Sequence, residues 1–416
     1  RIELYDHFVA STVAEIRLKL GEQALDQAIW RTIRRAFVSR VEGLPDNEFT
    51  KTFFSSITRR LFRTVGVAPE LEFVATELDP LASVTSEVIK EVYTNRGALA
   101  LLIEDLLDNL RYRSRWRDFD HSVEYVTTEI ERYHSQTGER RNVQRVEVVR
   151  PVFYQVGRAY VVGRVIGRGY VRPLVIALKN TERGILVDAV IMNEDDVSIL
   201  FGFTRSYFHV DLDRVGEAVV FLKQLLPRKP VSELFTVLGR AKQGKTERYR
   251  ELMRHLGSAT DRFVHAPGER GLVMVCFTLP SFDIVFKVIR DRFAYPKTVL
   301  REEVLAKYRF VFKHDRAGRL VDAQEFKRLR FKRDLFAPKL IEELMSETAD
   351  TVHTDGDDLI FDHLYIERRM TPLNLYLRQA SPAAAERAVI DYGQAIRDLA
   401  YTNIFAGDLL LKNFGV

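Results

Sequence analysis

The sequence predicts an α+β fold in which helical segments flank an antiparallel sheet, and a second sheet precedes a further helical segment. Three observations support it. Apolar residues recur at helical spacing through 1–140, short β-branched runs fill 141–212, and a second strand-rich block opens at Phe263. Because 416 residues exceed one ordinary domain, we expect at least two, at 1–261 and 262–416.

The first domain is expected to contain three segments. Apolar residues at three- and four-residue steps in "FVASTVAEIRLKL", "FFSSITRRLF" and "ALALLIEDLLDNL" predict helices within 1–140. The runs "AYVVGRVIG", "VRPLVIAL" and "GILVDAVIM" are rich in β-branched residues and predict an inserted antiparallel sheet over 141–212. Helical spacing returns in "EAVVFLKQLL" and "ERYRELMRHL", which predicts a helical segment over 213–261.

The second domain is expected to begin with a small sheet. Strand-like sequence in "RGLVMVCFTLPSFDIVFKVI" is followed by a helical pattern over about 298–313 and by further strand-like runs near Phe326 and at 359–366. From 367 to 416 the pattern is helical. A small sheet that includes one helix and is followed by a helical lobe is the order of a protein-kinase fold. We therefore expect a small lobe at 262–366 and the start of a large lobe at 367–416.

Composition narrows the classes of function. The 63 basic residues are interleaved with 58 acidic ones, and no zinc-ligand spacing or aromatic RNA-binding box is present, so we expect no nucleic-acid partner. No apolar run approaches the roughly 20 residues of a membrane span, so no membrane partner is expected. The single cysteine, Cys276, excludes a disulfide framework and favours a cytoplasmic protein.

A glycine loop and a lysine form the first candidate site. From Gly268 onward, "APGERGLV" fits the kinase pattern G-x-G-x-x-G-x-V, with Ala266 in place of the first glycine. Lys287 follows in the apolar run "DIVFKVI", where an inward lysine needs an anionic partner such as a nucleotide phosphate or a helix carboxylate. We expect Glu302 or Glu303 to be that carboxylate. A plain hairpin turn and a solvent-facing strand lysine are the alternatives.

The segment "GDLLLKN" near the end of the chain is the second candidate. Asp408 and Asn413 have the spacing of a kinase base and a metal-binding amide, and Lys412 could lie against the transferred phosphate. Taken alone, the segment could equally be a turn or a helix cap. Its position after the glycine loop and Lys287 favours a catalytic loop. The further aspartate of the D-F-G position is not reached, so the kinase-like domain is expected to be incomplete at its C-terminus.

A competing motif spans 239–246. The segment "GRAKQGKT" formally matches the Walker A pattern G-x-x-x-x-G-K-T. However, the preceding "PVSELFTVLGR" reads at least as well as a helix, and no alternating strand–helix pattern surrounds it. A basic turn at a helix start could still hold a phosphate.

The sequence resembles the bacterial isocitrate dehydrogenase kinase/phosphatase family. The resemblance is carried in colinear order by "RIELYDHFV", "SILFGFTRSYF", "KTERYRE", "APGERGLVM", "FDIVFKVIRDRFA", "HDRAGRLVDAQEF", "HLYIERRMTPLN" and "NIFAGDLLLKNFGV". The match begins a little way into the family's chain and stops before its end, so we expect a fragment truncated at both ends. The resemblance implies that 1–261 is a regulatory domain and 262–416 a kinase-like domain.

The resemblance further implies an ATP-dependent protein serine/threonine kinase that also acts as a protein phosphatase on isocitrate dehydrogenase, and so controls the branch between the tricarboxylic acid cycle and the glyoxylate bypass. The expected cofactors are ATP and Mg²⁺, with Mn²⁺ as an alternative, and AMP and ADP are expected effectors. "HLYIERRM" takes the position of the hinge that grips adenine. The implied catalytic residues are Asp408, Asp322 (linked to the phosphatase reaction) and Lys412, the metal ligand is Asn413, and the nucleotide is bound by Ala266, Pro267, Gly268, Glu269, Arg270, Gly271, Leu272 and Lys287.

Other interpretations stay open. Lys245, Thr246 and Tyr249 could form a regulatory AMP pocket, since a lysine–threonine pair precedes an aromatic residue by one helical turn. A small-molecule kinase of the aminoglycoside type shares the G-D-x-x-x-x-N motif, and a nucleotide-binding pseudokinase would keep the loops without catalysis. A homodimer is also left open.

Overall fold

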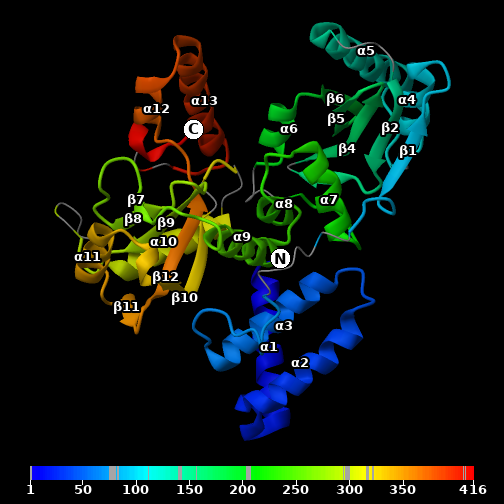
Figure 1. The fold of residues 1–416 in the computed structure, drawn as a ribbon. Coiled ribbons are helices and arrows are strands. Elements are labelled where there is room, and N and C mark those ends of the chain that lie inside the picture. Colours follow the sequence, from blue (N-terminus) through cyan, green and yellow to red (C-terminus); the bar gives the residue numbers. More distant parts are fainter. Residues whose placement is uncertain are drawn as a thin grey trace. The chain divides into compact units, whose positions relative to one another are not determined.

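The computed structural model describes two compact units (Figure 1). The first comprises Arg1–Glu3, Ser39–Thr52 and Leu78–Arg248, and the second comprises Leu4–Val38, Phe53–Glu77 and Tyr249–Val416. The residues described are 2–74, 81, 84–110, 112–138, 143–155, 157–202, 208–293, 295, 300–314, 318–320, 323–405, 407 and 409–416.

The first unit is built on an antiparallel sheet with strand order β1-β2-β4-β5-β6, in which β3 pairs with β4. Its strands are β1 (Lys90–Thr94), β2 (Val143–Val149), β3 (Phe153–Gln155), β4 (Arg158–Gly167), β5 (Tyr170–Thr181) and β6 (Gly184–Ile191). Its helices are α4 (Leu99–Asp108), α5 (Phe119–Thr137), α6 (Glu194–Leu200), α7 (Val215–Leu225) and α8 (Val231–Val237).

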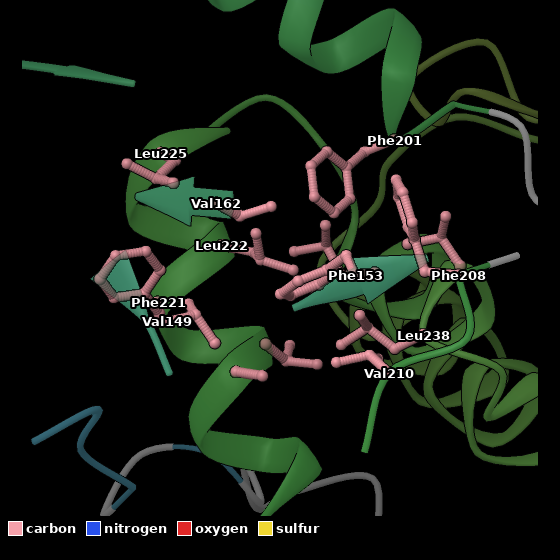
Figure 2. Close-up of a cluster of buried hydrophobic side chains, with 14 of the residues drawn as sticks. Val149, Phe153, Val162, Phe201, Phe208, Val210, Phe221, Leu222, Leu225 and Leu238 are labelled. Carbon is pink, nitrogen blue, oxygen red and sulfur yellow. The ribbon is translucent and has the colours of Figure 1, made fainter. Parts of the chain in front are cut away.

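Both faces of this sheet are buried. Neighbouring residues of β4 face opposite sides, so Val161 packs into the cluster formed with α4 and α5, whereas Val162 packs into the cluster formed with α7 and α8. Figure 2 shows the second cluster, where the Phe153 and Phe208 rings meet edge to face with centroids 5.5 Å apart. Burial on two faces explains why runs such as "VRPLVIAL" are continuously apolar rather than alternating.

The second unit contains a second antiparallel sheet, with strand order β10-β12-β9-β8-β7 and β11 paired to β12. Its strands are β7 (Val264–His265), β8 (Met274–Thr278), β9 (Ile284–Ile289), β10 (Gln324–Lys332), β11 (Val352–Asp355) and β12 (Asp358–Arg368). Its later helices are α10 (Arg301–His314), η2 (Arg333–Leu335), α11 (Pro338–Glu347), α12 (Leu373–Gln379), α13 (Pro382–Tyr401) and η3 (Leu411–Asn413).

N-terminal helices belong to this second unit for most of their length. They are α1 (Ile2–Leu20), η1 (Gly21–Leu25), α2 (Gln27–Val41) and α3 (Asn47–Phe62). After α3, the Gly66 amide donates to the Arg328 carbonyl at 2.7 Å, which joins the segment to strand β10. The Glu72 carboxylate nearby is fully buried, and it accepts hydrogen bonds from Arg59 at 2.9 Å and Thr64 at 2.6 Å. A buried carboxylate needs such partners, so this contact fixes the chain that follows α3 to that helix.

Aromatic side chains dominate the core on one side of the second sheet. The Phe277 and Phe286 rings stack with centroids 4.9 Å apart, and Phe263 and Phe336 pack beside them. A smaller cluster includes Tyr365 of β12 and Tyr308 of α10, whose rings stack at 4.2 Å. Helix α10, the element that follows β9 in the chain, therefore packs against the sheet.

The predicted α+β class is confirmed. The expected helix near 298–313 is α10, and the strand-like runs near Phe326 and at 359–366 are β10 and β12. Several elements were not predicted. Strand β1 lies in a segment expected to be helical, α6 lies in the segment expected to contain strands, and α11 and β11 lie between β10 and β12. No helix in the described part of the chain is both long and apolar enough to cross a membrane.

Candidate active site

Lys287 lies on β9, the third strand of the second sheet in chain order, and α10 is the next element. Its cross-strand neighbours are Cys276 on β8 and Tyr365 on β12, so these side chains share a face of the sheet. Burial raises the pKa of the Cys276 thiol, so that side chain stays neutral next to the lysine. A lysine on the third strand followed by a helix is the arrangement of a kinase small lobe.

The expected partner of Lys287 was wrong. Its ammonium nitrogen lies 2.6 Å from a carboxylate oxygen of Glu367 on β12, whereas Glu302 and Glu303 of α10 are exposed. Glu367 is only 3% exposed, and a buried carboxylate is stable only beside a cation or several donors. Register explains the pairing: Glu367 is two residues from Tyr365, the cross-strand partner of Lys287, and so lies diagonally on the same face.

The glycine loop joins β7 to β8 and is therefore the turn of a β-hairpin. The hairpin and nucleotide-loop interpretations are thus compatible, because a hairpin turn can also bind a nucleotide. The Ala266 amide donates to the Cys276 carbonyl at 3.0 Å, which closes the base of the loop. Gly268 has φ +125°, a conformation that only glycine adopts without strain. A Cβ on Gly271 would lie 2.9 Å from the Met274 carbonyl oxygen. The local structure therefore requires glycine at both positions, and the absence of a side chain also leaves the backbone accessible to a ligand.

An ion-pair network that the sequence did not reveal fixes this loop. Arg290, at the end of β9, is 4% exposed and donates to the Gly271 carbonyl at 3.1 Å. It also pairs with Glu343, at 2.8 Å, and with Glu347, both on α11. Arg270 in the loop pairs with the same two carboxylates. Helix α11 thus anchors the glycine loop at two points. Its glutamates pair directly with the Arg270 side chain, and they hold Arg290, which binds the backbone carbonyl of Gly271.

Glu343 pairs with three side chains of this network. His265, which precedes the loop, lies 2.5 Å from its carboxylate through Nε2. Burial alone would raise the pKa of Glu343, but hydrogen bonds from Arg290 and His265, together with the two arginine charges, hold that pKa below its ordinary value. The carboxylate therefore stays ionised at neutral pH and holds both arginines.

The segment after Asp408 meets the glycine loop. The Lys412 ammonium lies 2.8 Å from the Glu269 carboxylate, and this hydrogen bond is the main reason that the pKa of Glu269 is lowered. Val416 and Thr371 exchange backbone hydrogen bonds at 2.9 and 3.1 Å, so the end of the segment pairs with the chain that follows β12. Two predicted site elements, far apart in the sequence, are thus brought together.

Three further residues were predicted to belong to the site. Asn413 is exposed on η3, directly after Lys412. Asp408 and Asp322 lie outside the described residues. Within the described residues, no group of three His, Cys, Asp or Glu side chains gathers as a metal site. An amide oxygen such as that of Asn413 does suit Mg²⁺, which usually takes only one or two protein ligands beside phosphates and water.

The Walker-like segment is not a phosphate-binding loop. The residues before it form helix α8, and Gly244 lies inside helix α9 (Ala241–Leu256). A Cβ on Gly244 would lie 2.2 Å from the Thr236 hydroxyl and 2.5 Å from the Ser232 carbonyl oxygen, so this glycine allows α8 and α9 to pack closely. The P-loop alternative is therefore excluded.

The candidate AMP residues also lie on α9. The Thr246 hydroxyl donates to the Lys242 carbonyl at 3.1 Å, one turn earlier in the helix. Lys245 lies beside Thr246 on the same helix. Tyr249 is 9% exposed and belongs to the aromatic core of the second unit, where burial raises the pKa of its phenol.

The whole chain is similar to proteins of known families. Residues 1–260 match the family model "Isocitrate dehydrogenase kinase/phosphatase (AceK), regulatory domain", and residues 261–416 match "Isocitrate dehydrogenase kinase/phosphatase (AceK) kinase domain". The chain is 46% identical over 416 residues to the isocitrate dehydrogenase kinase/phosphatase of Anaeromyxobacter dehalogenans (strain 2CP-C), covering 100% of this chain and 71% of that relative. It is 45% identical over 418 residues to the protein of that name from Xanthomonas campestris pv. campestris (strain 8004), covering 100% of this chain and 72% of the relative.

Proposed function

The chain belongs to the isocitrate dehydrogenase kinase/phosphatase family, and from this premise we propose that it phosphorylates a serine of isocitrate dehydrogenase with ATP and removes that phosphate again. Reversible phosphorylation of this enzyme controls how isocitrate divides between the tricarboxylic acid cycle and the glyoxylate bypass. The kinase reaction requires ATP and a divalent metal ion.

The observation that carries the proposal is the ion pair between Lys412 and Glu269, which brings the predicted catalytic loop to the predicted nucleotide loop. A phosphoryl group transferred at this junction would lie beside a lysine that can neutralise its charge. Phosphoryl transfer depends mainly on such positioning and electrostatic stabilisation. On binding, the nucleotide competes with Glu269 for Lys412.

We assign roles to the site as follows. Residues 266 to 272 surround the phosphates, with the backbone N–H groups from 268 onward as donors, and the Lys287 ammonium, held by Glu367, balances the charge of the α- and β-phosphates. Asp408 orients the serine hydroxyl and accepts its proton. Asn413 supplies an amide oxygen to Mg²⁺, which offsets charge on the phosphates when bound.

Two parts of the proposal concern regulation and the reverse reaction. Asp322 is proposed to act in removal of the phosphate, and AMP is proposed to act through Lys245, Thr246 and Tyr249 on α9. The match of residues 1–260 to the family's regulatory domain supports a regulated activity. The domain division at 261/262, a homodimer and the use of Mn²⁺ also remain proposals.

A substrate panel tests the proposal. The protein is incubated with labelled ATP and Mg²⁺ and either isocitrate dehydrogenase or small alcohols, including an aminoglycoside. We expect label on the protein serine, and release of that label as phosphate when phosphorylated isocitrate dehydrogenase is supplied with adenine nucleotide. Label on the aminoglycoside alone would favour the small-molecule kinase. Nucleotide binding without transfer to any acceptor would favour the pseudokinase.

A further inference from the structure

A cavity of about 390 Å³ lies in the first unit, whereas the residues assigned to phosphoryl transfer belong to the second. It is formed at one end of the sheet, where the β3–β4 and β5–β6 hairpins meet the loop that precedes α5. Buried Leu178 and Ile185 contribute apolar surface to it. A cavity of this size fits a small organic molecule.

The walls of the cavity are fixed by backbone hydrogen bonds. Tyr154 and His209 exchange two such bonds, at 2.9 and 2.8 Å, which hold two walls together. The Ile185 amide donates to the Arg115 carbonyl at 2.9 Å, so the loop before α5 is fixed to β6. A Cβ on Gly184 would lie 2.6 Å from the same carbonyl oxygen, which shows how closely the two segments approach. The site is therefore formed before any ligand arrives.

Cationic side chains line the cavity, and the described residues that line it include no aspartate or glutamate. Arg113, Arg158 and Lys179 all contribute to its surface. Arg158 is neutralised by Asp188, which lies 2.8 Å away. Among the described residues, no carboxylate lies within ion-pair distance of Arg113 or Lys179. Their charges favour an anion at this position.

Tyr112, which lines the cavity, has a hydroxyl with an unmet hydrogen bond. The Tyr112 hydroxyl is buried and has no hydrogen-bond partner among the described residues. Burial, and to a smaller extent the neighbouring Tyr154, raises the pKa of this phenol, so it keeps its proton and remains a donor. An unsatisfied buried donor costs free energy, and an oxygen of a bound ligand would remove that cost.

We propose that this cavity is a binding site for a small organic anion, whose carboxylate or phosphate group is held by Arg113 and Lys179 and accepts a hydrogen bond from Tyr112. Its apolar body packs on Leu178 and Ile185. This site is independent of the proposed phosphoryl transfer, because none of its residues has a role in that reaction.

Titration calorimetry with two probes tests the inference. Phenyl phosphate and benzoate each combine a flat apolar body with one anionic group, and benzyl alcohol is the uncharged comparison. We expect saturable binding of at least one anion and at least tenfold weaker binding of benzyl alcohol. Whichever anion binds more tightly identifies the charged group that the site prefers.

Variants place the binding in the cavity. We expect Lys179→Ala to weaken anion binding about tenfold and Tyr112→Phe about threefold to tenfold, in line with one charge-assisted and one neutral hydrogen bond. Arg168→Ala, an exposed arginine at the opposite end of β4, is the matched control and should bind like the parent. If circular dichroism shows that Lys179→Ala is misfolded, Arg113→Ala replaces it. Absence of saturable binding, equal affinity for benzyl alcohol, or binding unaffected by the folded lysine or arginine variant would overturn the inference.

Discussion

Replacement of Arg290 by methionine should weaken nucleotide binding, although Arg290 is assigned no contact with the nucleotide and acts through the glycine loop. The substitution removes the hydrogen bond from the Arg290 guanidinium to the Gly271 carbonyl, whereas Glu343 and Glu347 keep Arg270 as a partner. A hydrogen bond from a charged donor contributes about 1.5–3 kcal/mol. If the loop must be ordered to bind ATP, a loss of about 2 kcal/mol corresponds to a dissociation constant raised on the order of thirtyfold.

The assay is an equilibrium titration with a fluorescent ATP analogue, paired with amide hydrogen exchange across the glycine loop. We expect weaker binding together with faster exchange in the loop. Arg290→Lys should be intermediate, because an ammonium keeps the charge but not the planar set of donors. Arg292→Met is the matched control, since Arg292 is exposed and two residues away. A dissociation constant within twofold of the parent value, with unchanged loop exchange, would refute this role for α11 and Arg290.

Three further outcomes are expected. Lys287→Met should abolish phosphoryl transfer and lower thermal stability, because it leaves Glu367 unpaired. Adding Glu367→Gln to this variant should restore stability but not transfer. Recovery of both stability and transfer, or of neither, would contradict the pairing. Gly244→Ala should destabilise the chain by about 1–3 kcal/mol in chemical denaturation, because the added Cβ has no room between α8 and α9. The control Gly393→Ala in helix α13, where nothing lies within 4 Å of the added Cβ, should be neutral or stabilising by up to about 1 kcal/mol. Equal effects of the two substitutions would count against close packing of α8 on α9. Hydrogen bonds from His363 and Lys327 lower the pKa of the Glu325 carboxyl from 4.5 to about 2, so its contribution to stability is full above pH 4.5 and is lost as the pH falls toward 2. Unfolding followed against pH should show a shallower acid loss in Glu325→Gln, and an unchanged slope would exclude Glu325 as a cause.

Periodicity and turn residues were sufficient to predict the class of fold. Apolar spacing located α10, and β-branched runs located β10 and β12, because burial on a defined face imposes a defined repeat. Strand β1 was missed because five residues at a sheet edge, only partly buried, give a weak alternation. The Walker-like segment shows the converse: its glycine is required for helix packing, a reason that spacing alone cannot distinguish from phosphate binding.

The candidate site was predicted in its parts but not in its pairings. Lys287 was recognisable as a charge within an apolar strand, and Glu367 is the same signal in "HLYIERRM". Joining them required the strand register, which depends on tertiary structure. Arg290 and the two glutamates of α11 carry no motif. Only their spacing of four residues in "PKLIEELMSE" indicates that the acids share a helix face, and nothing in the sequence indicates what that face meets.

The most direct test of the proposed kinase mechanism is transfer of labelled phosphate from ATP to isocitrate dehydrogenase by the Asp408→Asn variant of the full-length protein. Asparagine keeps the size of the side chain but cannot accept the serine proton, so we expect transfer to fall by at least a hundredfold while nucleotide affinity stays within a few-fold of the parent protein. Transfer at the parent rate would contradict the assignment of "GDLLLKN" as the catalytic loop.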